Sequence, residues 1–214
     1  MANAKVWKNV AVAMESARAA AKTITAVTKA TPGVASSTAH GYANGDILIL
    51  TAQGMFQIDQ RVVRVAGVAA DTFQLEGIDT TGFETFVSGT AAKLTMGTSI
   101  TTATTVNPSG GDFDFIDTTT IHAAQRSQIP GLPSASTFGM DHIHDVSDAG
   151  LLAMKTATDA QQKKAFVFTF GQGGQKMYFA GYVGASLLPG GQSQGLVTTT
   201  TAVTMEGVAT YYAS

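Results

Sequence analysis

Two histidines and two aspartates fall within five residues, and their spacing could bind a transition metal. The segment reads Asp141-His-Ile-His-Asp145, and alternate residues of a β-strand point to one face, so His142 and His144 would lie side by side. Imidazole and carboxylate groups are ligands for zinc and iron. A catalytic metal needs a third convergent ligand, but His40 and His122 occur in segments without a recognisable motif. We therefore predict a structural, solvent-facing strand here, with a metal enzyme as the alternative.

Three acids between residues 112 and 117 have a spacing that could bind calcium. Asp112, Asp114 and Asp117 supply carboxylates, but the segment lacks the turn glycine and the distal glutamate of a calcium-binding loop. The acids alternate with Phe113 and Phe115, and such alternation is typical of a strand with one face in the core. We therefore predict a half-buried strand and no calcium site.

The segment Gly171-Gln-Gly-Gly-Gln-Lys176 shares only its glycine content with a phosphate-binding loop. It lacks the Gly-Lys-Ser/Thr ending and precedes a predicted strand, whereas phosphate binding requires a helix N-terminus. No Gly-x-Ser-x-Gly elbow provides a serine nucleophile, and the chain has no cysteine for a thiolate or a disulfide. The sequence thus predicts neither an enzyme nor a bound cofactor.

Charged residues are scarce in this chain. They make up 13% of the 214 residues, against about 25% in an average soluble domain, while hydrophobic residues make up 44%. The net charge is −2 and no basic run occurs, which argues against binding of nucleic acid phosphates. A surface of neutral polar residues repels its own copies weakly, so self-association is favoured. No apolar stretch reaches the length of a secretion signal or a membrane span, so we expect folding in a cytoplasm.

Short runs rich in β-branched and aromatic residues, bounded by Gly, Asn, Asp or Pro, recur along the whole chain. They predict strands at residues 6–14, 23–29, 47–50, 61–65, 72–75, 113–117, 166–170, 177–183, 198–205 and 208–212. The expected fold class is therefore mainly β.

One stretch, from Ser147 or Asp148 to about Lys164, has the periodicity of a helix. Its stripe recurs at intervals of three and four residues and consists of Ala149, Leu152, Ala153, Ala157 and Ala160. Ser147 or Asp148 can cap the first turn, and Lys163 and Lys164 would lie where the helix dipole favours cations. Because the stripe consists mostly of small residues, this helix should depend on packing against a sheet.

The strands expected at 166–170 and 177–183 form the clearest hairpin. Phe166, Phe168 and Phe170 share one face of the first strand, and the intervening glycines tolerate the turn conformation. Aromatic side chains in such a row predict the face that meets the core, under the helix.

Composition shifts near Lys22 and near residues 93–95 divide the chain. The part between them carries four basic and six acidic residues, and turn signals such as Ala43-Asn-Gly-Asp46 punctuate it. We expect residues 23–94 to form a small β-barrel inserted into a larger domain made of residues 1–22 and 95–214.

The inserted part resembles a small β module of phage structural proteins that is also similar to one in ubiquitin-activating enzymes. The resemblance rests on His40-Gly-Tyr-Ala-Asn-Gly-Asp46, Gly54-Met55, Arg61-Val-Val-Arg-Val65, Asp71-Thr-Phe-Gln-Leu75 and Gly77-Ile-Asp-Thr-Thr81. It implies display or spacing and no chemistry.

The flanking parts resemble the tail tube proteins of long, flexible-tailed phages. The resemblance rests on Phe113-Asp-Phe-Ile-Asp-Thr-Thr-Thr-Ile121, Ile129-Pro-Gly-Leu132, the helix, the hairpin and the closing strands to Tyr212. It implies two packed β-sheets with one flanking helix, and hexameric rings whose strands join around a channel. Strand pairing with neighbouring copies would also satisfy the unpaired backbone N–H and C=O groups at the sheet edges.

This resemblance implies a structural protein of the virion tail, assembled in the host cytoplasm, whose tube conducts genomic DNA as a transient cargo. The implied partners are other copies of the chain and the tape measure, terminator and baseplate proteins, without a membrane anchor. The alternative is a decoration or receptor-binding protein of the virion surface that uses the inserted module.

Several residues are candidates for subunit contacts or for the channel wall. A wall of lysine and arginine would hold DNA phosphates, so we expect a neutral to acidic wall. Threonine favours extended backbone and presents an uncharged hydroxyl, although an ordinary exposed sheet face would show the same composition. Trp7 is the only tryptophan and could reach a neighbour, with burial in its own core as the alternative. The candidates are Trp7, Asp112, Asp114, Thr198, Thr199, Thr200 and Thr201.

Overall fold

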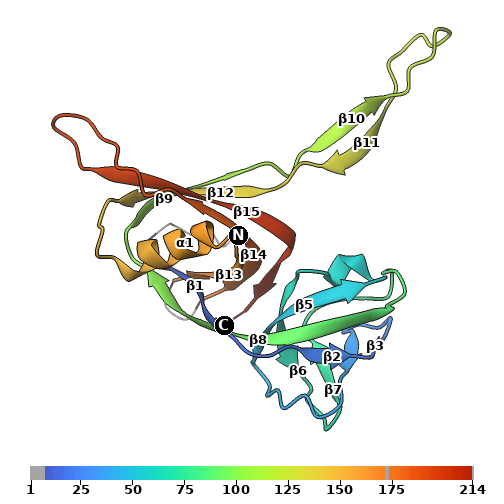
Figure 1. Cartoon of the computed structure of the whole chain (residues 1–214). Helices are drawn as coiled ribbons and strands as arrows, with labels where there is room; N and C mark the ends of the chain where they lie inside the picture. The colour runs from blue at the N-terminus through green and yellow to red at the C-terminus, as the bar shows by residue number, and fades with distance from the viewer. Residues whose placement is uncertain (1–7, 172–173, 214) are drawn as a thin grey trace.

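A computed structural model describes residues 8–171 and 174–213 and confirms the mainly β fold class with one α-helix (Figure 1). Trp7, and with it the start of the strand expected at 6–14, lies outside the described residues. The elements are β1 Val10–Arg18, β2 Lys22–Ile24, β3 Ala26–Val27, β4 Val34–Ser36, β5 Ile47–Gln53, the 3-10 turn η1 Phe56–Ile58, β6 Val62–Ala66, β7 Thr72–Leu75, β8 Ser88–Ile100, β9 Ala103–Ser109, β10 Phe113–Asp117, β11 Gln128–Pro133, β12 Thr137–Ile143, α1 Ala149–Asp159, β13 Lys163–Phe170, β14 Lys176–Ala185 and β15 Thr198–Tyr212.

Thirteen of these strands share one curled sheet. Its order is β3-β4-β7-β6-β5-β8-β1-β13-β14-β15-β12-β9, and β2 pairs with β8 beside this path. The remaining strands, β10 and β11, pair only with each other. Because the sheet curls back on itself, the packed layers expected from the sequence belong to one continuous hydrogen-bonded path.

Strands β2 to β7 and the first half of β8, which we call the module strands, enclose a buried cluster of their own, with Leu48, Phe73 and Ala91 fully buried. Tyr42 closes it by donating its hydroxyl hydrogen to the carbonyl of Ala91 at 2.8 Å. The expected ends of the inserted part fall at the start of β2 and inside β8. The strand β8 therefore runs without a break from this cluster into the rest of the sheet.

A second cluster lies between the sheet and α1. Phe166 and Phe168 of β13 pack there with Phe179 of β14, and Met154 and Ala157 of α1 cover them. The rings of Phe166 and Phe179 stack with centroids 5.5 Å apart. The prediction that the hairpin phenylalanines face the core under the helix is confirmed.

The helix begins as predicted but buries a stripe that only partly matches the expected one. Asp148 caps α1, and its Oδ1 accepts a hydrogen bond from the Leu151 N–H at 2.8 Å. The buried residues are Gly150, Leu151, Met154 and Ala157, whereas Leu152 is 46% exposed. The expected stripe is confirmed at Ala157 and at Ala153, which packs against the second cluster, but was wrong at its other positions, because Gly150 brings the buried face close to β8: a Cβ at Gly150 would lie 2.7 Å from the Ser99 carbonyl oxygen.

The end expected for the helix near Lys164 was also wrong. The helix stops at Asp159, and Gln161 then adopts a φ of 50°, a left-handed conformation that helices commonly use to terminate. Lys163 and Lys164 already belong to β13. Lys163 does not interact with the helix dipole but contacts Gln60 and Glu206.

A third cluster joins the module strands to the far face of β13 and β14. Ile49, Val62 and Leu94 pack there against Val167 and Tyr178, and the full cluster also contains Ala92, Ala165, Ala180 and Tyr212. Strand β13 is thus buried on both faces. Its unbroken apolar run, Ala165 to Phe168, is what a strand between two packed layers requires.

The ribbon of β10 and β11 extends away from the body at the end of β9 and β12 (Figure 1). We call residues 110–136 the arm. The half-buried strand expected at Phe113 and Phe115 was wrong in its burial, since every residue of β10 is exposed. Gly110 and Gly111 take φ values of 81° and 86° where the arm begins, a conformation that glycine adopts without strain.

Candidate assembly surfaces

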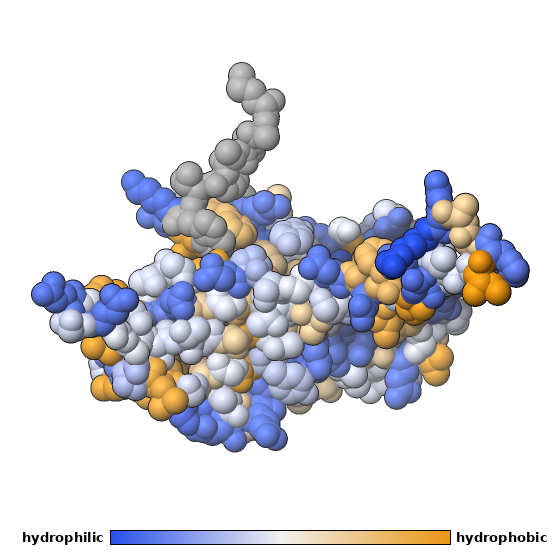
Figure 2. All heavy atoms as spheres, turned by 90° about the horizontal axis from the view of Figure 1, so that it is seen from above, coloured by the Kyte–Doolittle hydropathy of each residue, from blue (hydrophilic) through white to orange (hydrophobic). Residues whose placement is uncertain are grey.

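One face of β9, β12 and β15 is an uncharged, threonine-rich surface, apart from one acid. The register places Asn107 beside Gly139, and Gly139 beside Ala202. Side chains alternate between the two faces along each strand, so the other outward-facing residues form similar rows across the three strands. We call this surface the threonine face. It consists of Thr105, Asn107, Ser109, Thr137, Gly139, Asp141, Ile143, Thr198, Thr200, Ala202 and Thr204. Figure 2 looks onto the molecule from this side and shows a broad surface of intermediate hydropathy.

Asp141 is the acid at the centre of the threonine face. Its Oδ2 accepts a hydrogen bond from Thr105 Oγ1 at 2.6 Å, and its Oδ1 accepts one from Thr200 Oγ1 at 3.1 Å. These two bonds link β9, β12 and β15 across the surface. The sequences of the three strands contain neither lysine nor arginine. The face therefore offers DNA phosphates no cation to bind.

The four candidate threonines divide between the two faces of β15. Thr200 is exposed and Thr198 is partly exposed, so both belong to the threonine face. Thr199 and Thr201 are 2% and 1% exposed and point to the side of the sheet that holds the second cluster. Alternation along a strand requires this division, and only Thr198 and Thr200 could touch a channel or a neighbour directly.

Several residues of the threonine face were missed by sequence reasoning. Thr105 and Asn107 lie in β9, which was not predicted as a strand, and Thr137 lies at the start of β12, of which only the end from Asp141 was predicted. Pro108 and Gly139 weaken the strand pattern there. The alternation of small polar residues in Thr105-Val-Asn-Pro-Ser109 was the available signal.

His142 lies behind the threonine face and is 0% exposed. Its Nε2 lies 2.8 Å from Thr201 Oγ1, and its Nδ1 lies 3.2 Å from Thr102 Oγ1. The prediction of a solvent-facing histidine was wrong, because β12 is an inner strand between β9 and β15 and two hydroxyl groups satisfy the ring. His144 follows the end of β12 and does not pair with His142 along the strand.

No group of three or more His, Cys, Asp or Glu side chains is placed to hold a metal ion among residues 8–171 and 174–213. The described part of the chain also has no helix long and apolar enough to cross a membrane.

The stability of the fold should fall in mild acid because of His142. Burial lowers the pKa of His142 below 6.5, and Asp148 and Asp141 only partly oppose this. The unfolded chain, whose histidine has a pKa of about 6.5, then binds the proton more readily than the folded chain. Stability should be complete above that pH and be lost as the pH falls below it. The urea midpoint of the monomer, measured from pH 7.5 to pH 5, should show this slope.

His142→Gln should flatten that slope, because glutamine can still donate to Thr201 but does not titrate. His122→Gln on the exposed arm is the matched control and should leave the slope unchanged. The carboxylates with a lowered pKa, Glu76, Asp79, Asp117 and Asp145, titrate below this window and do not obscure it. An equal slope in His142→Gln and the natural chain would show that another group is responsible.

The arm exposes an unusual amount of apolar surface. Phe113, Phe115 and Ile116 of β10 are between 54% and 60% exposed, and Ile129 and Leu132 of β11 are 51% and 86% exposed. The two candidate contact residues at positions 112 and 114, both aspartates, lie among them and are exposed. None of these residues belongs to a buried cluster of the described chain. Beyond its base, where the Met205 N–H of β15 donates to the Ser136 carbonyl at 2.8 Å, the described part of the arm is held by its own strand pairing.

A protein-family model described as phage tail tube protein, TTP, matches residues 53–214. The match begins at the last residue of β5 and covers both the threonine face and the arm. No curated protein sequence matches the chain.

Proposed function

Because the chain belongs to the phage tail tube protein family, a structural family of the virion tail, we propose that its copies form rings that stack into a hollow tube, and that this tube conducts DNA. The ring is proposed to contain six copies. The proposed neighbours at the ends and inside the tube are the terminator, baseplate and tape measure proteins. No step of this function requires catalysis, a metal or a cofactor.

The exposed arm is the observation that carries the proposal. A two-stranded ribbon alone in water is marginally stable, and apolar side chains gathered on a projecting element mark an interaction surface. At about 3.3 Å per residue, the outgoing side from Gly110 to Ile121 can extend on the order of 40 Å, far enough to cross a neighbouring copy. A self-assembling structural protein explains such an arm, because neighbouring copies would cover it.

The threonine face is proposed to line the channel. It lies on the side of the sheet opposite α1, so the helix would lie on the outside of the tube. The face presents neutral hydroxyl and amide groups and the single acid Asp141. It therefore lacks the cations that would release counterions from the DNA phosphates and so hold the DNA in the channel. The neutral to acidic wall expected from the sequence is thus assigned to β9, β12 and β15.

Thr200→Lys tests the proposed wall. Each copy in a ring would add one cation to the channel, and we expect DNA ejection from otherwise normal particles to slow severalfold. Thr156→Lys on the exposed face of α1 is the matched control and should eject at the normal rate. Ejection can be followed by the fluorescence of a DNA-binding dye after the trigger. Equal rates for the two variants would mean that this face does not line the channel.

Self-assembly itself is testable with the purified protein. We expect sedimentation velocity to show large species that grow with protein concentration, and negative-stain electron microscopy to show rings or hollow filaments. A chain that stays monomeric at high concentration would contradict the proposed function.

A further inference from the structure

A basic groove lies between the module strands and β14. Its volume is about 470 Å³, and residues of β5, β6, β8 and β14 line it. The cations are Arg64, Lys93 and Lys176, the acid is Asp46, and the partly exposed apolar lining is Ile47 and Met96. We call this site the basic groove.

The groove keeps an excess of positive charge. Lys93 pairs with Asp46 at 2.7 Å, and Arg64 pairs with Glu76 through two bonds of 2.5 and 2.6 Å. Arg64 holds the pKa of Glu76 below its usual value, as expected for a pair that stays ionised. Lys176 forms no ion pair with any residue of the described ranges. One lysine of the groove is thus available to an acid from outside.

The arm has the complementary pattern. Asp112 and Asp114 alternate with Phe113 and Phe115, and all four are exposed. Neither carboxylate has a hydrogen bond or an ion pair with another side chain of the described residues. An extended segment of alternating acids and aromatic rings matches a groove lined by cations and by apolar side chains.

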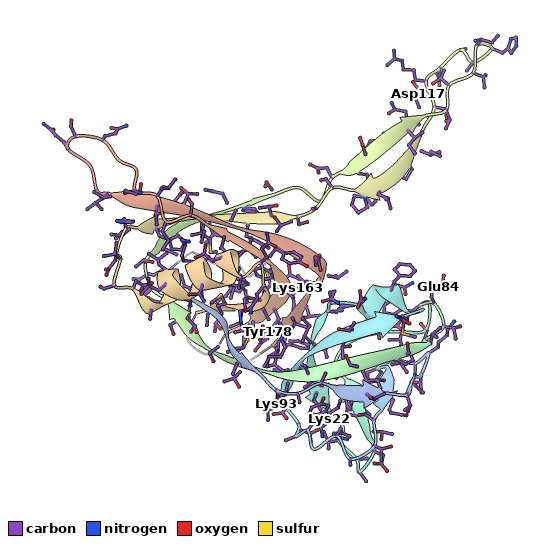
Figure 3. The ribbon with its side chains drawn as sticks, viewed as in Figure 1. Lys22, Glu84, Lys93, Asp117, Lys163 and Tyr178 are labelled. Atoms are coloured by element: carbon purple, nitrogen blue, oxygen red, sulfur yellow. The ribbon has the colours of Figure 1, made fainter. Side chains whose placement is uncertain are left out.

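The arm and the groove lie at separate places on the same molecule. In Figure 3 Asp117 marks the arm, while Lys93 and Tyr178 lie in the body, away from it. Two complementary surfaces at separate places on one chain form a head-to-tail contact, and such contacts propagate into filaments or close into rings. The arm of one copy would therefore meet the groove of another.

We propose that the arm of each copy docks into the basic groove of the next copy, with Asp112 and Asp114 facing Lys176 of β14 and the phenylalanines, on the opposite face of the arm strand, against Ile47 and Met96 of β5 and β8. This inference rests on the proposed function, since it specifies the contact through which copies join. The partner is a second copy of this chain.

Charge reversal on each side tests the contact. Asp114→Lys and Lys176→Glu should each raise the protein concentration at which tubes form by about tenfold or more, because like charges then face each other. The two substitutions in one chain should restore tube formation. Lys29→Glu, an exposed lysine of the module outside the groove, is the matched control and should assemble normally. Circular dichroism melts of the dilute variants check that each monomer is folded.

Mixing the two single variants shows whether the contact joins different copies. The basic arm of the Asp114→Lys chain fits the acidic groove of the Lys176→Glu chain, and the unchanged arm of the second variant fits the unchanged groove of the first. An equal mixture should therefore form tubes at concentrations where neither variant forms them alone.

Three outcomes would count against these ideas, and they are distinguishable. Normal tubes from both single variants would overturn the arm–groove contact while leaving the proposed function standing. Loss of tubes in the single variants without recovery in the mixture would also overturn the arm–groove contact, since the groove would then bind an acidic partner other than the arm. Absence of tubes from the natural chain would contradict the proposed function itself.

Discussion

A chain without the arm is expected to fold normally and to form no tubes. Residues 112–133 can be replaced by a short Asn-Gly turn, because the two ends that remain are already joined: the Gly111 N–H donates to the Ser134 carbonyl at 3.2 Å. The three buried clusters contain no arm residue, so the monomer should lose little stability. Assembly should be lost because the exposed apolar surface that copies share is gone.

Electron microscopy and sedimentation velocity measure the effect of the arm, and a thermal melt checks the fold. A milder variant, Phe113→Ser with Phe115→Ser, keeps the ribbon and removes only apolar surface. It should also assemble poorly, since both rings are more than half exposed in the monomer and have no folding role. Tubes of normal length from either variant would show that the arm does not carry assembly.

Excision of residues 23–94 is expected to leave no folded protein. We propose that this segment is an inserted module, but its strands cover the far face of β13 and β14 through the third cluster. Excision would expose Val167, Tyr178 and Tyr212, and burial of each such side chain contributes about 1.5–3 kcal/mol. Domains are stable by only about 5–15 kcal/mol, so this loss should abolish folding. Soluble yield and circular dichroism of the excised chain are the measurements.

The decoration hypothesis predicts the opposite outcome, with tubes intact and host attachment lost. A gentler variant separates the two hypotheses. Tyr212 packs against Tyr178, and its hydroxyl accepts a hydrogen bond from the Arg64 N–H at 2.8 Å. Tyr212→Ala should lower the free energy of unfolding by about 3–5 kcal/mol. The module and the rest of the chain should still unfold in a single transition, at a lower temperature. Two separate transitions, with the module melting alone, would show that it is a detachable display unit.

Local sequence signals predicted much of the fold because they reflect local physics. The strands at 72–75 and 113–117 have the expected bounds, and Asp148 caps the helix as its side chain suggested. The strand expected at 23–29 is split into β2 and β3, and the two expected at 198–205 and 208–212 are one strand, β15. A β-bulge near Gly207 lets the pairing continue there, which composition does not reveal.

Burial was harder to predict than secondary structure. The polar ring of His142 was expected at the surface, but Thr102 and Thr201 come from other parts of the chain to satisfy it. The phenylalanines of the arm were expected in the core because they alternate with acids, as in a strand with one face buried. That expectation assumes that the covering surface belongs to the same copy. Under the proposed function, the surface that covers Phe113 and Phe115 belongs to another copy of the chain.

A reconstruction of tubes formed by the purified protein tests the central claim most directly. Electron cryomicroscopy should show stacked rings around an open channel, with β9, β12 and β15 inside, α1 outside, and each arm lying on another copy. Solid filaments, or rings in which the threonine face points outward, would contradict the claim that this sheet forms the wall of a DNA channel.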